Sequence, residues 1–122
     1  DKQVIDNLKT FDNFCVLSPQ ENQVVESAVE LLKSRMNNGC SGCQYCMPCA
    51  AGVDIPLNFR IWNDYGLYRL KPETQWFWNN DIKEEAKAKN CIGCGECEAI
   101  CPQHIDIRRD LKKLQTQLDR IK

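Results

Sequence analysis

Residues 91–102 read CIGCGECEAICP, and their four cysteines follow the spacing C-x2-C-x2-C-x3-C-P. An upstream segment, residues 40–49 (CSGCQYCMPC), carries four more cysteines, but its last gap is one residue shorter and Ala50 stands where the second array has a proline. The eight cysteines are Cys40, Cys43, Cys46, Cys49, Cys91, Cys94, Cys97 and Cys101. Because thiolates bind soft metal ions well, eight thiols in two short stretches predict a fold organised around metal.

The spacing of the second array is the one that two-cluster ferredoxins use. Three thiolates separated by two residues on a wrapped loop can each reach a different iron of one [4Fe–4S] cubane, while the fourth is directed to the other cluster. The small Gly93 and Gly95 let backbone N–H groups approach the cluster sulfides. We therefore expect two [4Fe–4S] clusters with crossed ligand sets, one held by Cys40, Cys43, Cys46 and Cys101 and the other by Cys91, Cys94, Cys97 and Cys49.

Other uses of the cysteines fit the pattern less well. Structural zinc sites need only paired C-x2-C units, and a run of cysteines at every third position ending in C-P is unusual for zinc. A disulfide framework is disfavoured because the chain has nine cysteines, an odd number, and shows no secretory signal. A redox-active dithiol needs a single C-x-x-C unit. The alternative that stays open is a structural or interaction module in which zinc or iron–sulfur stabilises the fold without redox turnover.

Charge and hydropathy exclude several classes of protein. Sixteen Lys and Arg residues against 17 Asp and Glu residues give a formal net charge of −1, so the chain lacks the basic footprint of a nucleic-acid-binding protein. The sequence contains no run of 18 apolar residues, so it predicts no membrane span. The opening residues have no basic segment followed by an apolar one, as a signal peptide would. Since cytosolic thiols stay reduced, we predict a cytoplasmic protein.

Apolar periodicity predicts helices and no strands. Val4, Ile5, Leu8 and Phe11 have helical spacing within residues 1–17, and Ser18 with Glu21 forms a capping box for the next helix. That helix is predicted to stop at residues 37–39 (NNG) in left-handed geometry. Further helices are predicted from Asp54 to about Gly66, over residues 82–89, and after Asp106. The helix after Asp106 has an apolar face made of Ile107, Leu111, Leu114, Leu118 and Ile121.

An internal repeat relates the two halves of the chain. Cys49, Val53, Asp54 and Ile55 correspond to Cys101, Ile105, Asp106 and Ile107 at a constant offset of 52 residues. In each half a cysteine array is followed by an apolar–Asp–apolar triplet and a helix. The predicted fold is therefore mostly α, an α-helical ferredoxin-like domain with two Cys-rich cluster-binding loops and a pseudo-two-fold internal repeat.

The remaining chemically notable residues receive structural interpretations. Cys15 is predicted to be a buried apolar thiol. His104 is predicted to be a surface imidazole, and the segment 76–78 (WFW) to be core or an interdomain anchor. Tyr45 and Met47 are expected to shield a cluster from water. No Ser/His/Asp constellation, no phosphate-cradling glycine loop and no paired general acid and base occur, so no catalytic residues for substrate chemistry are predicted.

The two arrays with their surroundings resemble a known family. The segments 40–49 and 52–56 (GVDIP), together with residues 91–105, look like the C-terminal iron–sulfur region of ferredoxin-linked aldo/keto reductases. The opening segment 6–11 (DNLKTF) is similar to the end of that family's reductase barrel. The resemblance covers nearly the whole chain and is weakest over residues 67–81.

That resemblance implies a division into domains. Residues 1–17 would be the tail of a preceding aldo/keto reductase barrel, and residues 18–122 a helical ferredoxin-like iron–sulfur domain. NAD(P)H would bind only on the N-terminal barrel, which also holds that family's catalytic residues. The expected function is electron transfer through two [4Fe–4S] clusters within a larger oxidoreductase. The expected partners are the fused reductase domain and a redox partner protein, or another electron donor or acceptor, with no nucleic acid and no membrane span.

Overall fold

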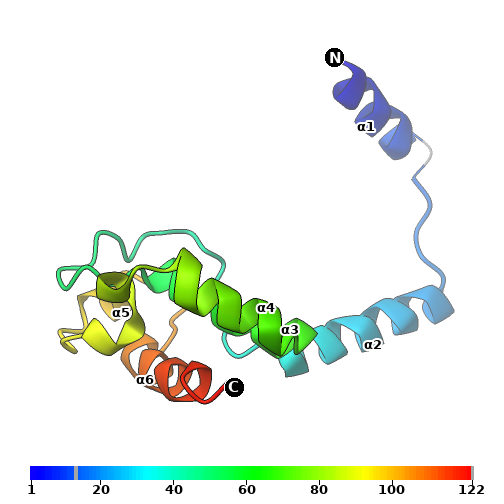
Figure 1. Cartoon of the computed structure of the whole chain (residues 1–122). Coiled ribbons are helices and arrows are strands. Elements are labelled where there is room, and N and C mark those ends of the chain that lie inside the picture. The colour runs from blue at the N-terminus through cyan, green and yellow to red at the C-terminus, as the bar shows by residue number, and fades with distance from the viewer. Residues whose placement is uncertain (13, 122) are drawn as a thin grey trace. The chain divides into compact units, whose positions relative to one another are not determined.

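The computed structural model describes residues 1–12 and 14–121 and divides the chain into two compact units, residues 1–31 and 32–122. Figure 1 shows helices joined by loops, and the described residues contain no strand, so the predicted mostly helical class is confirmed. The elements are α1 (Lys2–Asp12), α2 (Pro19–Arg35), α3 (Ile55–Tyr68), α4 (Lys71–Trp76), η1 (Phe77–Asp81), η2 (Glu84–Ala86), η3 (Ala88–Asn90), α5 (Glu96–Ala99) and α6 (Ile107–Leu118). None of these helices has the length and apolar character that a membrane crossing requires.

The first unit contains α1 and most of α2. The capping box forms as predicted: Ser18 N donates to Glu21 Oε2 at 2.8 Å, and Glu21 N donates to Ser18 Oγ at 3.3 Å. Neither helix buries a residue. Cys15, in the connector between them, is exposed, so the prediction of a buried thiol is wrong. An extended connector supplies no packing layer of its own to cover a side chain.

The core of the second unit lies between α3 and α6, which pack on each other. Its fully buried side chains include Val53, Ile55, Phe59, Ile107, Leu111 and Leu114. Trp62 of α3 donates its indole N–H to Gln117 of α6 at 2.7 Å, so the two helices also share a polar link. Because the two helices occupy equivalent places in the internal repeat, the core is the plane where the two halves meet.

The end of α2 packs closely on α3 at Gly66. A Cβ at Gly66 would meet the carbonyl oxygen of Arg35 and lie 2.7 Å from Asn37 Nδ2, so only glycine fits there. The predicted left-handed stop at residues 37–39 is wrong, because none of these residues has a positive φ. Instead, the free N–H groups of Asn37 and Asn38 donate to Asn63 Oδ1 at 2.9 Å and 3.0 Å. These two N–H groups thus bond to a side chain of α3, whereas in a left-handed cap they would donate to carbonyl oxygens in the last turn of α2.

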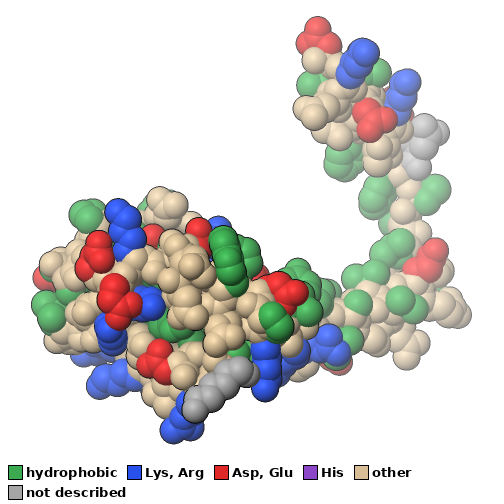
Figure 2. All heavy atoms as spheres, in the orientation of Figure 1, with side chains coloured by type: hydrophobic (Ala, Val, Ile, Leu, Met, Phe, Trp, Pro, Cys, Tyr) green, Lys and Arg blue, Asp and Glu red, His purple; other side chains and the backbone are tan. Residues whose placement is uncertain are grey.

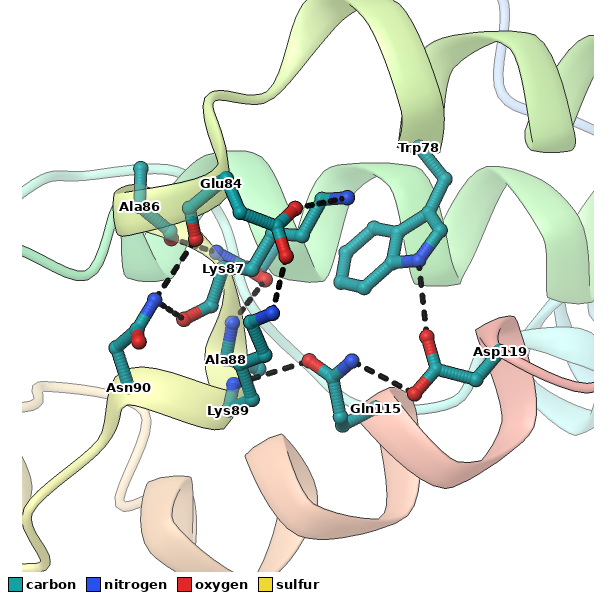
Figure 3. Close-up of polar contacts among 10 residues, drawn as sticks. Trp78, Glu84, Ala86, Lys87, Ala88, Lys89, Asn90, Gln115 and Asp119 are labelled. Carbon is teal, nitrogen blue, oxygen red and sulfur yellow. Dashed lines mark hydrogen bonds and ion pairs between the residues drawn. The ribbon is translucent and has the colours of Figure 1, made fainter.

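The aromatic segment 76–78 divides between core and surface. Trp78, in the π-helical turn η1, is buried and donates its indole N–H to Asp119 Oδ1 at 3.3 Å. Figure 3 shows this bond and Lys87, whose Nζ lies 5.1 Å from the Trp78 ring centroid. Trp76 and Phe77 pack edge to face at 5.2 Å and stay exposed. Of the three, only Trp78 is the core residue that the sequence predicted.

Residues 82–89 form two 3-10 turns, η2 and η3, rather than the predicted solvated helix. Two of their hydrogen-bonding groups are taken by side chains of other helices: Ala88 N donates to Asn58 Oδ1 and Lys89 N to Gln115 Oε1, each at 2.9 Å. Glu84 forms ion pairs with Lys87 and Lys89 (Figure 3). The hydrogen bonds from Lys87 and Lys89, together with their charges, lower the pKa of Glu84 to about 2.

Candidate metal centres

The two cysteine arrays have matching backbone conformations. Gly42 and Gly93, which lie between the first and second cysteines of each array, have φ values of 70° and 75°. The residues between the second and third cysteines, Gln44 and Gly95, have φ values of 65° and 86°. These left-handed residues make each loop wrap around its own cysteines, a conformation that glycine adopts without strain. The repeat inferred from four positions therefore extends through both arrays.

The segment after each array is also repeated. Cys49 O accepts from Gly52 N at 2.9 Å, and Cys101 O accepts from His104 N at 3.1 Å. Each chain segment then makes an inverse γ-turn centred on an aspartate, with φ and ψ of −81° and 82° at Asp54 and of −75° and 73° at Asp106. These turns lead directly into α3 and α6, so each array is fixed to the start of a core helix.

The two aspartates differ in what they bind. Asp54 Oδ1 accepts from Leu57 N at 3.0 Å and caps α3 as predicted. Asp106 stands at the same place before α6, but its side chain makes no capping hydrogen bond. Its carboxylate pairs with Arg109 at 3.0 Å instead. Asp106 thus occupies the predicted capping position, but its carboxylate binds the guanidinium of Arg109 and does not cap α6.

Buried polar side chains of α3 hold the segments that lead into the arrays. Asn58 is fully buried; its Nδ2 donates to the carbonyl oxygens of Asp54 at 2.7 Å and Ala86 at 2.9 Å, and its Oδ1 accepts from Ala88. Ala88 lies three residues before Cys91, so Asn58 fixes the segment that leads into the second array. Asn63 fixes the segment that leads into the first array through its contacts with residues 37 and 38.

The residues of α6 that lie 52 positions later also hold the segments that lead into the arrays. Each one holds the segment of the other array than its counterpart in α3 does. Asp110 corresponds to Asn58, is 5% exposed, and accepts from Asn38 Nδ2 at 3.4 Å. Gln115 corresponds to Asn63 and accepts from Lys89 N. Each helix therefore holds the segments that lead into both arrays. None of these four side chains was predicted from the sequence, because the repeat was recognised only over residues 49–55 and 101–107; the same 52-residue offset, continued into the helices, pairs them.

One pocket of about 80 Å³ brings together cysteines of both arrays. Its lining includes Cys49 of the first array with Cys91, Cys94 and Cys97 of the second, and also Cys46. Met47, Ile55 and Leu111 also line the pocket and give part of its wall an apolar character. Tyr45 is 65% exposed and does not line this pocket, so the expected shielding by Tyr45 is not seen at this site.

Two thiols of the first array, Cys40 and Cys46, have raised pKa values. Burial raises the pKa of the Cys40 thiol, and the nearby thiols of Cys43 and Cys101 raise it further. Burial likewise raises the pKa of Cys46, with added contributions from Cys40, Cys43 and Cys101. The last cysteine of the second array therefore lies within electrostatic reach of the first array. Burial, followed by Glu98 and then Cys91 and Cys94, raises the pKa of Cys97 to about 11.

An ion pair that was not predicted from the sequence borders the pocket with Cys49. Arg108 Nη2 lies 2.8 Å from Glu98 Oε2, Arg108 N donates to Glu98 Oε1 at 2.8 Å, and Arg108 also lines the pocket. The hydrogen bonds from Arg108 lower the pKa of Glu98. The residue 52 positions before Arg108 is Pro56, so only one half carries this cation.

The donor chemistry of both cysteine sets fits iron–sulfur clusters. Four thiols in each set are the donors that [4Fe–4S] clusters use, each thiolate binding a different iron. Within residues 1–12 and 14–121, no group of three or more His, Cys, Asp or Glu side chains is arranged to hold a single metal ion. His104 is exposed, as predicted, and does not line the pocket with Cys49.

Comparison with known families agrees with this chemistry. The family model of 4Fe-4S dicluster domains matches residues 39–105, a stretch that contains both arrays and all eight of their cysteines. Comparison with curated proteins and with solved structures found no match. Since the family match covers more than half of the chain, the chain belongs to the 4Fe-4S dicluster domain family.

Proposed function

We propose that this chain is an electron-transfer domain that binds two [4Fe–4S] clusters with crossed ligand sets. The observation that carries the proposal is the pocket in which Cys46 and Cys49 of the first array join Cys91, Cys94 and Cys97 of the second. The electrostatic coupling of Cys101 to Cys40 and Cys46 supports the complementary set. When bound, such clusters accept and release electrons one at a time.

The residues around the sites have roles that suit this function. Side chains of α3 and α6 fix the segments that lead into both arrays. Hydrogen bonds within the unit therefore position the cysteine loops. Met47, Ile55 and Leu111 exclude water from part of the pocket with Cys49. Arg108 places a positive charge at the same pocket, where added negative charge would be stabilised.

Metal analysis under anaerobic conditions tests the proposal directly. A loaded chain should contain about eight iron and eight sulfide, and its visible absorption should bleach on addition of dithionite. Electron paramagnetic resonance of the reduced sample should show reduced clusters. About two zinc per chain, or a sample that stays silent under strong reductant, would support a structural module instead and refute electron transfer.

The resemblance of segments 6–11, 40–49, 52–56 and 91–105 to the aldo/keto reductase family supports a further proposal about the larger protein in which the domain works. We infer that the domain serves a larger oxidoreductase of the aldo/keto reductase type, with residues 1–17 as the tail of its barrel and residues 18–122 as the iron–sulfur domain. NAD(P)H would bind to the barrel, and a reducing cytoplasm would suit nine free cysteines. If this is correct, NADPH will reduce the clusters of the full-length protein but not those of the domain alone.

A further inference from the structure

A basic groove runs along α6 from the second cysteine array toward the end of the chain. One pocket of about 630 Å³ is lined by Cys91 and Gly93 at the array and by Lys89, Arg108, Arg109 and Lys112. A second pocket of about 530 Å³ is lined by Lys71, Lys112, Lys113 and Arg120. Lys112 and Thr116 line both pockets, so the two pockets are adjacent along α6. Figure 2 shows several Lys and Arg side chains along the lower edge of the larger unit, near the place where Figure 1 labels α6, with Asp and Glu side chains among them.

The cations at the two ends of the groove differ in their partners. Arg108 is paired with Glu98, and Arg109 with Asp106. At the other end, Lys71, Lys112, Lys113 and Arg120 are exposed and form no ion pair with any residue that the structure describes. Arg69 adds another positive charge there, since its guanidinium lies 5.7 Å from the ring of Tyr65, which lines the same pocket.

Residues 32–122 contain 14 Lys and Arg against 11 Asp and Glu, a formal net charge of +3. Seven of these cations and one acid, Asp106, line the two pockets, so the rest of the unit has a formal net charge of −3 and the groove is a local reversal of sign. Unpaired cations on one face attract a partner of opposite charge and speed its association. The end of the groove at Cys91 places such a partner beside the cluster site of the second array.

We propose that this groove is the docking surface for an acidic one-electron carrier protein. The inference rests on the proposed electron-transfer function and names the partner of that site. In such a transfer, one electron would leave the reduced carrier, which becomes oxidised, and would reduce the cluster that Cys49, Cys91, Cys94 and Cys97 would hold; no covalent bond forms or breaks. Lys112, common to both pockets, is central to the surface.

Binding of flavodoxin, a small acidic one-electron carrier, to the cluster-loaded chain tests the proposal. Calorimetry at low and high salt should give an affinity that falls with ionic strength. Lys112→Glu and Lys113→Glu should each weaken binding about tenfold at low salt, whereas Lys112→Arg should retain it. Lys83→Glu is the matched control, because Lys83 is exposed and lines neither pocket. Unchanged iron content verifies that each variant is folded.

Three results would overturn the docking surface. These are no measurable binding of flavodoxin to the wild type, equal binding by Lys112→Glu and the wild type, and tighter binding of a single-stranded oligonucleotide than of flavodoxin at the same salt. Failure of the proposed function is recognised separately, by clusters that dithionite does not reduce. In that case, salt-sensitive binding of flavodoxin that depends on Lys112 would still support the docking surface. Reducible clusters without such binding would refute the docking surface and leave the proposed function in place.

Discussion

Asn58 binds Ala88 across 30 residues of sequence, with its Oδ1 accepting from the Ala88 backbone N–H at 2.9 Å in a fully buried position. The same side chain donates to the carbonyl oxygen of Ala86 at 2.9 Å. A single side-chain amide thus pairs with one backbone carbonyl oxygen and one backbone N–H of the segment just before the second array. The position of that array depends on a residue outside it.

Replacing Asn58 by Ala should therefore destabilise the protein although no cysteine is changed. A buried N–H left without a partner costs about 1–3 kcal/mol. The loss should be measured as a lower free energy of unfolding in anaerobic urea titrations of the loaded protein. Asn80→Ala is the control, since Asn80 is exposed and its side chain donates only to Trp76 O in its own helical segment. Equal stability of the two variants would contradict the role of Asn58.

Gly66 and Gly39 provide a matched pair of substitutions. Gly66→Ala should lower stability by about 1–3 kcal/mol, because the new methyl group would overlap the carbonyl oxygen of Arg35. Gly39→Ala should be nearly neutral, since its Cβ would meet nothing within 4 Å and Gly39 has no positive φ. Thermal unfolding under argon measures both. A Gly66→Ala variant as stable as the wild type would show that the end of α2 does not pack on α3.

The crossed ligand sets predict a selective effect of single cysteine substitutions. Cys49→Ser should remove the cluster shared with Cys91, Cys94 and Cys97, so that iron falls from about eight to about four per chain. Cys15→Ser should leave iron content unchanged, because Cys15 lies outside both arrays and is exposed. Iron and sulfide analysis after anaerobic purification is the measurement. Full iron occupancy in Cys49→Ser would rule out Cys49 as a ligand of either cluster and with it the crossed assignment.

Glu84 predicts a pH dependence of stability. Its folded pKa is lowered from 4.5 to about 2 by Lys87 and Lys89. A lowered carboxyl pKa stabilises the folded state above the unfolded pKa, and this contribution is lost as the pH falls through the folded pKa. The difference in Tm between the wild type and Glu84→Gln should thus be constant well above pH 4.5 and shrink below it. A difference that grows on acidification would contradict this assignment.

Sequence alone predicted the elements that depend on local chemistry. The capping box at Ser18 and Glu21, the cap at Asp54 and the wrapped cysteine loops all follow from residues a few positions apart. The family match over residues 39–105 agrees with the predicted iron–sulfur chemistry. These features need no knowledge of tertiary packing, because their hydrogen bonds close within one or two turns of chain.

Features that depend on distant partners were not predictable in this way. The end of α2 and the turns at residues 84–90 are set by Asn63, Asn58 and Gln115, which lie more than 20 residues away along the chain. Cys15 was expected to be buried from the usual behaviour of free cysteines. Local periodicity contains no term for such long-range hydrogen bonds, so the polar residues of α3 and α6 carried no signal until their 52-residue correspondence was seen.

Because α3 and α6 each hydrogen-bond to the segments that lead into both cysteine arrays, neither half of the repeat is complete by itself. Each helix fastens the approach to its own cysteine loop and to the loop of the other half. One half by itself would possess a sulfur-rich loop and a helix but only part of the bonds that secure them. Either half produced alone should therefore hold its cysteine loop less firmly than the whole domain does, and mixing the two halves should restore the missing bonds.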